Sequence, residues 1–199
     1  WKFSDIAPVA GEESQPGINE RYPRLIFSSS DNREEVYSFL TGQPAFLYAI
    51  PEEAKKMVNA ILEEKKDKFD IALEIQDRVV NDMRYYSIPF RPAAYVCRTP
   101  EQTWNSNGGT AVEKAVLMTA LLKTAGIDAR VAAVARTAFL DDKVATLADI
   151  DDFVVKIENK ERGTWYLSVT GLNPVNLKYT LPGRSFIQLE GGVKPVAEK

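Results

Sequence analysis

The sequence predicts an α+β fold in which helices pack on an antiparallel sheet. Three observations indicate this class. Helical apolar periods occupy the chain up to about residue 84, and strand-like runs follow residue 128. Between them, residues 115–125 are apolar on nearly every face, which is typical of a helix in the centre of a fold. The central buried helix is therefore expected over residues 111–125.

The entry to this central helix carries clear helix-start signals. Gly108 and Gly109 permit a tight turn, and Thr110 and Glu113 have the spacing of a capping box. Gly126 follows the last apolar residue, where a helix commonly ends in a left-handed residue. The first turn of such a helix offers free N–H groups and the positive end of the helix dipole. A cysteine there would be a strong nucleophile, but the first helical residue is Ala111.

Before the central helix, the sequence predicts an arm, a short strand and three helices. Residues 1–25 lack any period and are interpreted as an extended arm or linker, with a strand over residues 23–28. Ser30 or Asp31 is expected to cap a helix that runs to Leu40. Pro51 opens the next helix as its first residue, and a third helix spans residues 69–84.

The segment around the central helix and the C-terminal part complete the expected domain. Residues 85–106 contain three prolines and read as an irregular ordered loop. Strands are expected over residues 129–135, 153–158, 164–169 and 185–189, with a hairpin turn at residues 159–163. The predicted division is an arm (1–25), one domain (26–180) and a C-terminal strand or linker (181–199).

Composition excludes several classes of function. The chain has 199 residues, a net charge of -3, and 45% hydrophobic residues, so neither a nucleic-acid surface nor a membrane span is indicated. It starts at Trp1 without methionine, and we interpret it as a piece of a longer protein. It has one cysteine and no histidine, which excludes a Ser-His-Asp or Cys-His-Asp mechanism within the chain.

The order of elements resembles a known family. The residues that carry the likeness are Met83-Arg84-Tyr85, Arg98-Thr99-Pro100, the glycine turn, and above all the run from Glu113 to Val131. Over residues 52–173 the sequence resembles the bacterial transglutaminase-like superfamily, which belongs with papain-like thiol enzymes. The flanking segments at residues 1–6 and 181–184 resemble those of large bacterial envelope proteins, where β-domains of unknown function flank this domain. The likeness therefore implies a periplasmic or envelope location.

The resemblance also places the family's catalytic positions on this chain. The nucleophile position falls on Ala111. The histidine position falls on Asp152, with Asp151 or Phe153 as alternatives after a slip of one residue. The acid position falls on Ser168. We expect these to be vestigial triad positions. A groove beside them would use Tyr85, Cys97, Trp104 and Asn105, the last two lying nearest to the family's oxyanion position.

Three functional interpretations remain open at this point. The first is a catalytically inactive domain that acts as a binding or scaffold module, with the flanking domains of the same polypeptide as its partners. The second is an active thiol peptidase or amide transferase that uses Cys97, whose pKa the neighbouring Arg98 would lower. The third is a groove that binds a peptide or glycan without cleaving it, through its aromatic residues.

No cofactor or metal is expected. Five acidic residues of one segment suggest a calcium site, but their spacing fits no EF-hand, and a solvated acidic loop is the better interpretation. These residues are Asp141, Asp142, Asp149, Asp151 and Asp152.

Overall fold

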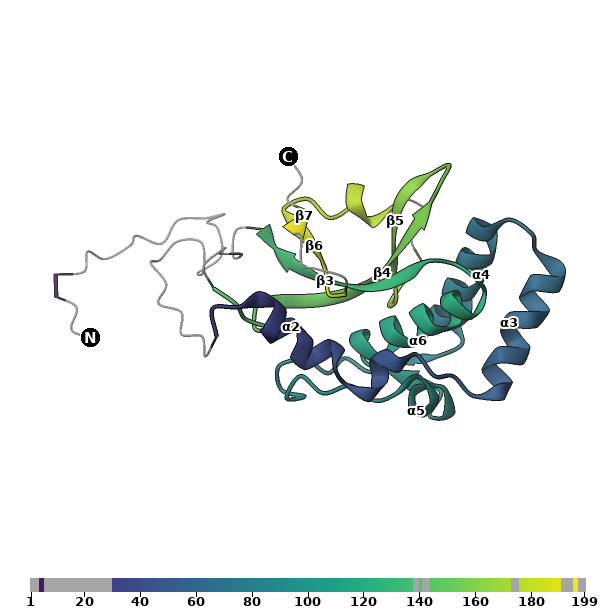
Figure 1. Cartoon of the computed structure of the whole chain (residues 1–199), viewed down its shortest axis with the longest axis horizontal. Coiled ribbons are helices and arrows are strands. Elements are labelled where there is room, and N and C mark those ends of the chain that lie inside the picture. Colours follow the sequence, from purple (N-terminus) through teal and green to yellow (C-terminus); the bar gives the residue numbers. More distant parts are fainter. Residues whose placement is uncertain are drawn as a thin grey trace.

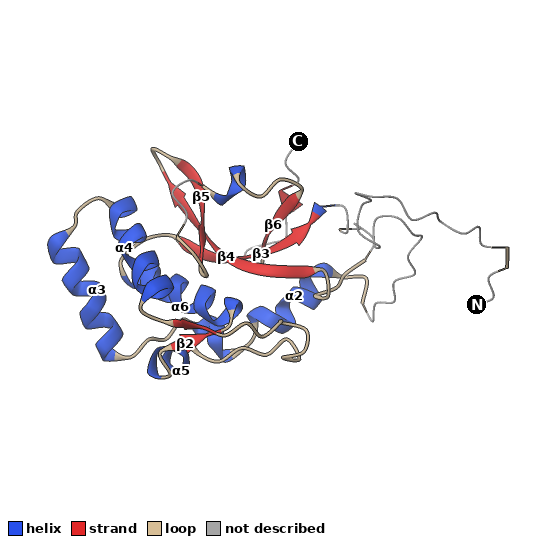
Figure 2. Cartoon of the chain, turned by 180° about the vertical axis from the view of Figure 1, so that it is seen from behind, coloured by secondary structure: helices blue, strands red, loops and turns tan. Residues whose placement is uncertain are grey.

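A computed structural model describes residues 4–5, 30–137, 140, 144–172, 176–190 and 195–196. Helices cover one face of a curled antiparallel sheet, and the central helix α6 lies between the sheet and the other helices (Figures 1 and 2). The predicted α+β class, with helices packed on an antiparallel sheet, is therefore confirmed. None of the helices in these ranges is long and apolar enough to cross a bilayer.

Several of the described α-helices begin at residues whose side chains accept hydrogen bonds from the first turn. The described α-helices are α2 (Arg33–Thr41), α3 (Glu52–Glu64), α4 (Lys68–Asn81), α5 (Pro100–Asn105) and α6 (Ala111–Thr124). Short 3₁₀ turns occur at Pro44–Leu47 and Leu177–Tyr179. Asp67 starts α4 by accepting hydrogen bonds from two backbone N–H groups of its first turn.

The strands form two sheets. β1 (Arg84–Tyr85) and β2 (Gly108–Gly109) pair in parallel. The five-stranded sheet has the order β5-β4-β3-β6-β7, and all its neighbouring pairs are antiparallel. Its strands are β3 (Ala129–Arg136), β4 (Ile150–Asn159), β5 (Gly163–Ser168), β6 (Arg184–Gln188) and β7 (Pro195–Val196). All four strands predicted after residue 128 are present, each shifted by no more than three residues at an end.

The core is built around α6. Every residue from Val112 to Leu122 is buried, as the sequence predicts. The helix-facing side of the sheet contributes alternate residues such as Phe153, Val155 and Ile157 to the same hydrophobic cluster. The opposite face of the sheet carries a smaller cluster that includes Val154, Tyr166 and Phe186. This alternation decides which strand residues can face the start of α6.

Several predicted boundaries need correction. Asn32 caps α2, rather than Ser30 or Asp31, because its Oδ1 accepts from the N–H groups of Glu34 (2.9 Å) and Glu35 (3.3 Å). Pro51 is the cap of α3 and not its first helical residue. The loop predicted over residues 85–106 contains α5. Its start is marked by a Thr99–Gln102 capping box, which the sequence analysis missed.

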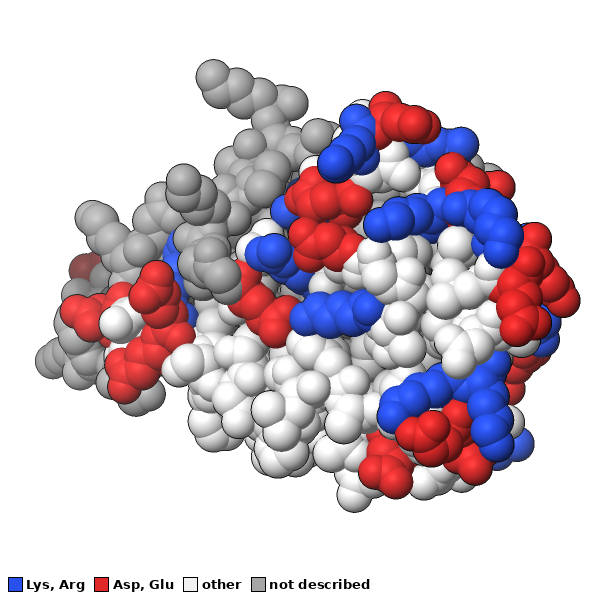
Figure 3. Space-filling view, turned by 45° about the vertical axis from the view of Figure 1, so that its right-hand side comes forward, with Lys and Arg blue, Asp and Glu red and all other residues white. Residues whose placement is uncertain are grey.

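Some expectations fall on residues outside the described ranges. These are the arm before residue 30 apart from residues 4–5, the strand at 23–28, and the acidic residues Asp141 and Asp142. The division into arm, domain and C-terminal linker stays a prediction. On the face shown in Figure 3, basic and acidic side chains intermingle around broad uncharged areas. That face therefore carries no single-sign patch of the kind that nucleic acid requires.

Lys114 is an unusual part of this core. It is fully buried on α6, and its Nζ donates a hydrogen bond to the carbonyl oxygen of Met83 at 3.0 Å. Burial disfavours the ammonium and lowers the pKa of Lys114 below its ordinary value of 10.5. The folded chain therefore binds fewer protons than the unfolded chain between the lowered and the ordinary pKa, so its stability should rise with pH in that window.

We expect Lys114→Met to remove this rise. The free energy of unfolding of the unchanged chain should increase relative to that of the variant as the pH rises toward the ordinary lysine pKa of 10.5, measured by denaturant titration at several pH values. The matched control is Lys56→Met, because Lys56 is an exposed lysine of α3. Parallel pH profiles for the unchanged chain and Lys114→Met would contradict a lowered pKa of Lys114.

Candidate functional site

The start of α6 is held in place by the parallel pairing of β1 with β2. Arg84 lies opposite Gly108, and Tyr85 lies opposite Gly109. A Cβ on Gly108 would stand 2.7 Å from the carbonyl oxygen of Arg84, so a larger residue does not fit this close approach. The chain then turns at Thr110, and Ala111 is the first residue of the helix. Ala111, the predicted nucleophile position, therefore lies at a positive helix end, and its side chain is a methyl group.

Ala111 lines a cavity of about 190 Å³ between the start of α6, the loop after β1 and the start of β4. Tyr85, Ile88 and Val96 contribute to its wall although their side chains are 44%, 54% and 60% exposed. Phe153 completes the wall from the sheet. Its ring meets the ring of Phe90 edge-on at a centroid distance of 4.8 Å, so the floor of the cavity is aromatic.

Strand alternation shows which residues of β4 and β5 face α6. Phe153 on β4 and Val169 just after β5 are buried in the helix-side cluster. Asp152 and Ser168 are their neighbours and fall on the other face by alternation. Of the predicted alternatives for the histidine position, Phe153 thus faces α6 and Asp152 follows the opposite face by alternation. The corresponding helix-facing residue at the acid position is Val169, one residue after Ser168.

Asp152 nevertheless reaches the edge of the cavity that contains Ala111. The pairing of β3 with β4 slips between Val134 and Ala135, opposite Asp151, and such a bulge redirects side chains. Oδ1 of Asp152 accepts the N–H of Phe153 at 2.8 Å. Burial raises the pKa of the Asp152 carboxyl, while the Phe153 N–H and the charge of Arg184 act in the opposite direction. A half-buried carboxyl with a raised pKa thus lies at one side of the cavity.

Ser168 lies apart from this cavity. Its Oγ accepts hydrogen bonds from the N–H groups of Thr170 (3.2 Å) and Gly171 (3.3 Å), which is a turn-stabilising arrangement. Its carbonyl oxygen accepts from Nε2 of the buried Gln76 at 2.9 Å. These contacts give Ser168 a structural role in joining the end of β5 to α4.

Glu113 organises the loop around the helix start. Its carboxylate accepts Nε of Arg98 at 2.8 Å and Nη2 at 2.9 Å, so the ion pair is bidentate. The same carboxylate accepts the N–H of Thr110 at 2.9 Å and the N–H of Arg98 at 3.2 Å. Arg98 also donates to Ser106 Oγ and to the carbonyl oxygen of Gly108, each at 2.9 Å. Burial opposes the charge of Glu113, but these hydrogen bonds prevail and lower its pKa.

Cys97 is buried beside this network and does not line the Ala111 cavity. Its N–H donates to Oε1 of Gln43 at 3.0 Å, and its Sγ lies 3.7 Å from the same oxygen. Burial, with a smaller effect of the Glu113 charge, raises the pKa of the Cys97 thiol to about 12. The expectation that Arg98 lowers this pKa is wrong, because the guanidinium is paired with Glu113.

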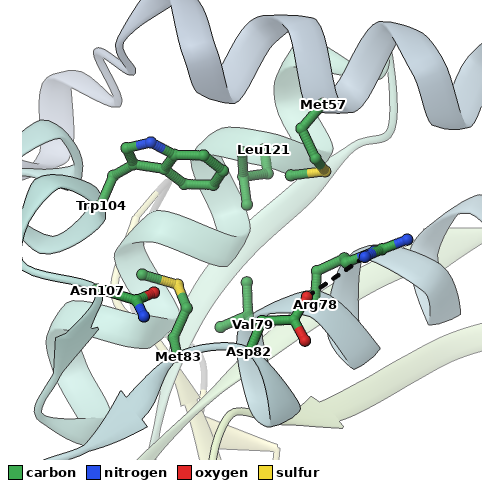
Figure 4. A pocket seen from close by; sticks show the side chains of 8 residues that line it. All are labelled: Met57, Arg78, Val79, Asp82, Met83, Trp104, Asn107 and Leu121. Atoms are coloured by element: carbon green, nitrogen blue, oxygen red, sulfur yellow. Dashed lines mark hydrogen bonds and ion pairs between the residues drawn. The ribbon is translucent and has the colours of Figure 1, made fainter.

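The four predicted groove residues do not share one groove. Tyr85 lines the Ala111 cavity, whereas Trp104 lines a different cavity between α3, α4, α5 and α6 (Figure 4). Asn105 is exposed at the end of α5. Sequence reasoning missed Ile88, Phe90 and Val96 as wall residues because the loop has no period that would reveal which side chains turn inward.

No group of three or more potential metal ligands occurs among the residues that the structure describes. Asp149, Asp151 and Asp152 lie within those ranges, and Asp151 pairs with Arg184 and with Arg136.

We compared the sequence and the fold of this chain with those of known proteins. The model of the transglutaminase-like superfamily matches residues 55–160. The fold is similar to a candidate protease from Parabacteroides distasonis ATCC 8503, with a TM-score of 0.66, 22% identity, and coverage of 81% of this chain and 30% of that protein. A candidate cysteine protease from Cytophaga hutchinsonii matches with a TM-score of 0.47 and 16% identity over 81% of this chain and 53% of that one.

The chain thus spans less than one third of the Parabacteroides protein. No curated protein sequence matches the chain. The family match covers α3 to β4, which includes the helix start at Ala111 and the aromatic wall at Phe153. The chain belongs to the transglutaminase-like superfamily.

Proposed function

We propose that this domain is a catalytically inactive member of its family that acts as a binding module. The observation that carries the proposal is the start of α6, where Ala111 occupies the predicted nucleophile position and Phe153 of β4 lines the same cavity. Val169, next to the predicted acid position, is buried in the helix-side cluster. None of these three side chains can attack a carbonyl, accept a proton or orient a base.

The rest of the chain offers no replacement for that chemistry. It contains no histidine, so a thiol or hydroxyl would lack its usual proton acceptor. Loss of a single triad nucleophile or base lowers the rate by on the order of 10⁶ in a well-measured hydrolase. The altered positions support inactivity more strongly than one substitution would.

The cavity supports binding rather than a purely structural role. Tyr85, Ile88 and Val96 are large apolar side chains that remain substantially exposed, and all three converge on the space beside Ala111. Asp152 adds an acidic group on the opposite side, next to Asp151, which pairs with Arg184 and Arg136. An extended peptide with an apolar side chain near a basic one complements this arrangement. Exposed apolar side chains that gather around a cavity mark interaction sites.

The direct test is a titration of short peptides by calorimetry. A peptide with a central Leu-Lys pair should bind more tightly than a Leu-Glu peptide of the same length, and Ile88→Ser should weaken both. Ile88 is suited to this test because its side chain is exposed and its removal leaves the core intact. If peptidoglycan fragments bind and none of the peptides does, the glycan alternative is favoured. If neither the peptides nor the peptidoglycan fragments bind, the scaffold role is favoured.

The competing proposal is a thiol enzyme based on Cys97. Its buried thiol should react with iodoacetamide at least about 100-fold more slowly than free cysteine at pH 8, since only on the order of 10⁻⁴ of a thiol with this pKa is ionised. The rate is measured by mass spectrometry of the folded protein, with the denatured protein as control. Rapid alkylation, together with amide hydrolysis or transamidation that Cys97→Ala abolishes, would overturn the proposal of an inactive domain.

The larger context of the domain is also a proposal. The chain spans 30% of the Parabacteroides protein, which supports a role as one module of a longer polypeptide whose flanking domains are its partners. The family resemblance of the flanks supports an envelope location. Fractionation of the native host with an antibody against residues 30–190 tests this location, and a purely cytosolic signal would contradict it.

A further inference from the structure

The structure contains a second cavity that the family chemistry does not use. It has a volume of about 270 Å³ and lies between α3, α4, α5 and α6, on the side of α6 away from the sheet. Its apolar lining comes from Met57, Val79, Met83, Trp104 and Leu121, whose side chains converge on one space in Figure 4. An apolar cavity of about 150 Å³ already accommodates benzene, so this one is large enough for a small organic molecule.

The polar groups at the edge of this cavity are few and specific. The carboxylate of Asp82 lies there, with Oδ2 accepting Nη1 of Arg78 at 3.4 Å. Its Oδ1 has no hydrogen-bond partner within the part of the chain that the structure describes, and neither has the side-chain amide of Asn107. Arg78 is shared, because its Nε also contacts Oε1 of Glu74 at 3.3 Å. Asp82 and Asn107 are both exposed, so a ligand at the mouth would meet the second carboxylate oxygen of Asp82 at the edge of the solvent.

Trp104 adds an aromatic wall to the same space. Its ring lies against the cavity, and an indole face attracts a cation that is brought close to it. The two thioether side chains, Met57 and Met83, are flexible and adapt to ligands of different shape. Asp82 favours a positive head group at the mouth, where Arg78 is the one basic lining residue and already pairs with both Glu74 and Asp82. The interior favours an apolar body.

We propose that this cavity binds a small amine that joins one ring or branched apolar group to a primary ammonium. The apolar body occupies the space between Leu121, Val79 and the ring of Trp104. The ammonium pairs with the carboxylate of Asp82 at the mouth of the cavity. The site is separate from the Ala111 cavity and shares none of its lining residues, so it does not depend on the proposed function.

The test uses 2-phenylethylammonium as the probe, titrated into the folded protein by calorimetry. We expect binding of one molecule per chain with a Kd of roughly 1 mM or tighter, as suits a ligand of this size. Phenylacetate has the same ring with a negative group and should bind at least about tenfold more weakly. Ethylammonium has the charge without the ring and should not bind measurably. Equal affinity for the ammonium and the carboxylate compound would overturn the proposal.

Variants locate the binding in this cavity. Asp82→Asn removes the charge and should weaken the probe by about tenfold, while Asp128→Asn, at an exposed residue outside the cavity, should leave the affinity unchanged. Met57→Trp should fill the space and abolish binding, and Met57→Leu should preserve it. Unchanged binding in Met57→Trp would show that the probe binds elsewhere. Absence of saturable binding to the unchanged chain up to about 10 mM would also refute the site.

Discussion

Replacement of Arg98 by methionine is expected to lower the free energy of unfolding by about 3–5 kcal/mol at neutral pH. The variant keeps much of the apolar stem but removes the guanidinium that pairs with Glu113 through two hydrogen bonds. Glu113 has a side chain only 8% exposed, so its carboxylate would stay buried without a cation. Arg98 itself is 36% exposed, and this partial hydration places the expected loss at the lower end of the range.

The dependence of this loss on pH identifies its cause. The pKa of Glu113 is lowered in the folded chain, so its ionised form contributes stability above the ordinary value of 4.5, and this contribution is lost as the pH falls through the lowered pKa. Without Arg98, burial should raise that pKa instead. The difference between the unchanged chain and Arg98→Met should therefore shrink on acidification below about pH 5.

Two control variants make the experiment specific. Arg98→Lys keeps the charge but cannot form the bidentate pair, and it should recover only part of the stability. Arg130→Met removes an exposed pair with Asp128, whose atoms lie 3.5 Å apart, and should change stability little. Denaturant titrations at several pH values measure all of these. A loss in Arg98→Met that is the same at pH 4 and at pH 7 would show that the arginine matters through packing rather than through the charge of Glu113.

The features that the sequence predicts best are those encoded within a few residues. The central helix could be predicted because Thr110, Glu113 and Gly126 mark its ends and its interior is apolar throughout. The strands could be predicted because runs of β-branched and aromatic residues are separated by turn residues, as in the hairpin of β4 and β5. The start of α5 is also encoded locally, since its Thr-x-x-Gln capping box is visible in the sequence. The surrounding prolines, however, favour a loop, and the helix was not predicted.

The candidate site could be predicted only in part, because it depends on strand register. A shift of one residue moves every side chain of a strand to the other face. Asp152 and Phe153 are neighbours in the sequence, but strand alternation directs their side chains to opposite faces of the sheet. A bulge opposite Asp151 makes the register of β4 harder still to predict. The position of the Trp104 side chain could not be predicted for a different reason. Its side-chain direction depends on how α5 packs against α3 and α6, which no local pattern reveals.

The second prediction with a large effect concerns the start of α6. Ala111→Cys, combined with Cys97→Val, is expected to create a thiol that iodoacetamide modifies on the order of 100-fold faster than the native Cys97 at pH 8. The position lies at the positive end of a 14-residue helix and on a cavity wall, and Ala111 itself is only partly buried. The native thiol is buried with a pKa of about 12, so nearly all of it stays protonated.

The same variant should remain without amidase activity. Phe153, whose ring contacts Phe90 edge-on, lines the cavity next to Ala111 and cannot act as a base for the new thiol. Adding Phe153→His supplies an imidazole on the helix-facing side, and it should lower the pKa of the introduced thiol further, seen as an alkylation rate that stays high at more acidic pH. Asp152→His is the comparison, because Asp152 lines the same cavity from the neighbouring position of β4. A greater effect from Asp152→His than from Phe153→His would favour Asp152 as the histidine position. Slow alkylation of the thiol introduced by Ala111→Cys would show that the helix start no longer has the geometry of a nucleophile site.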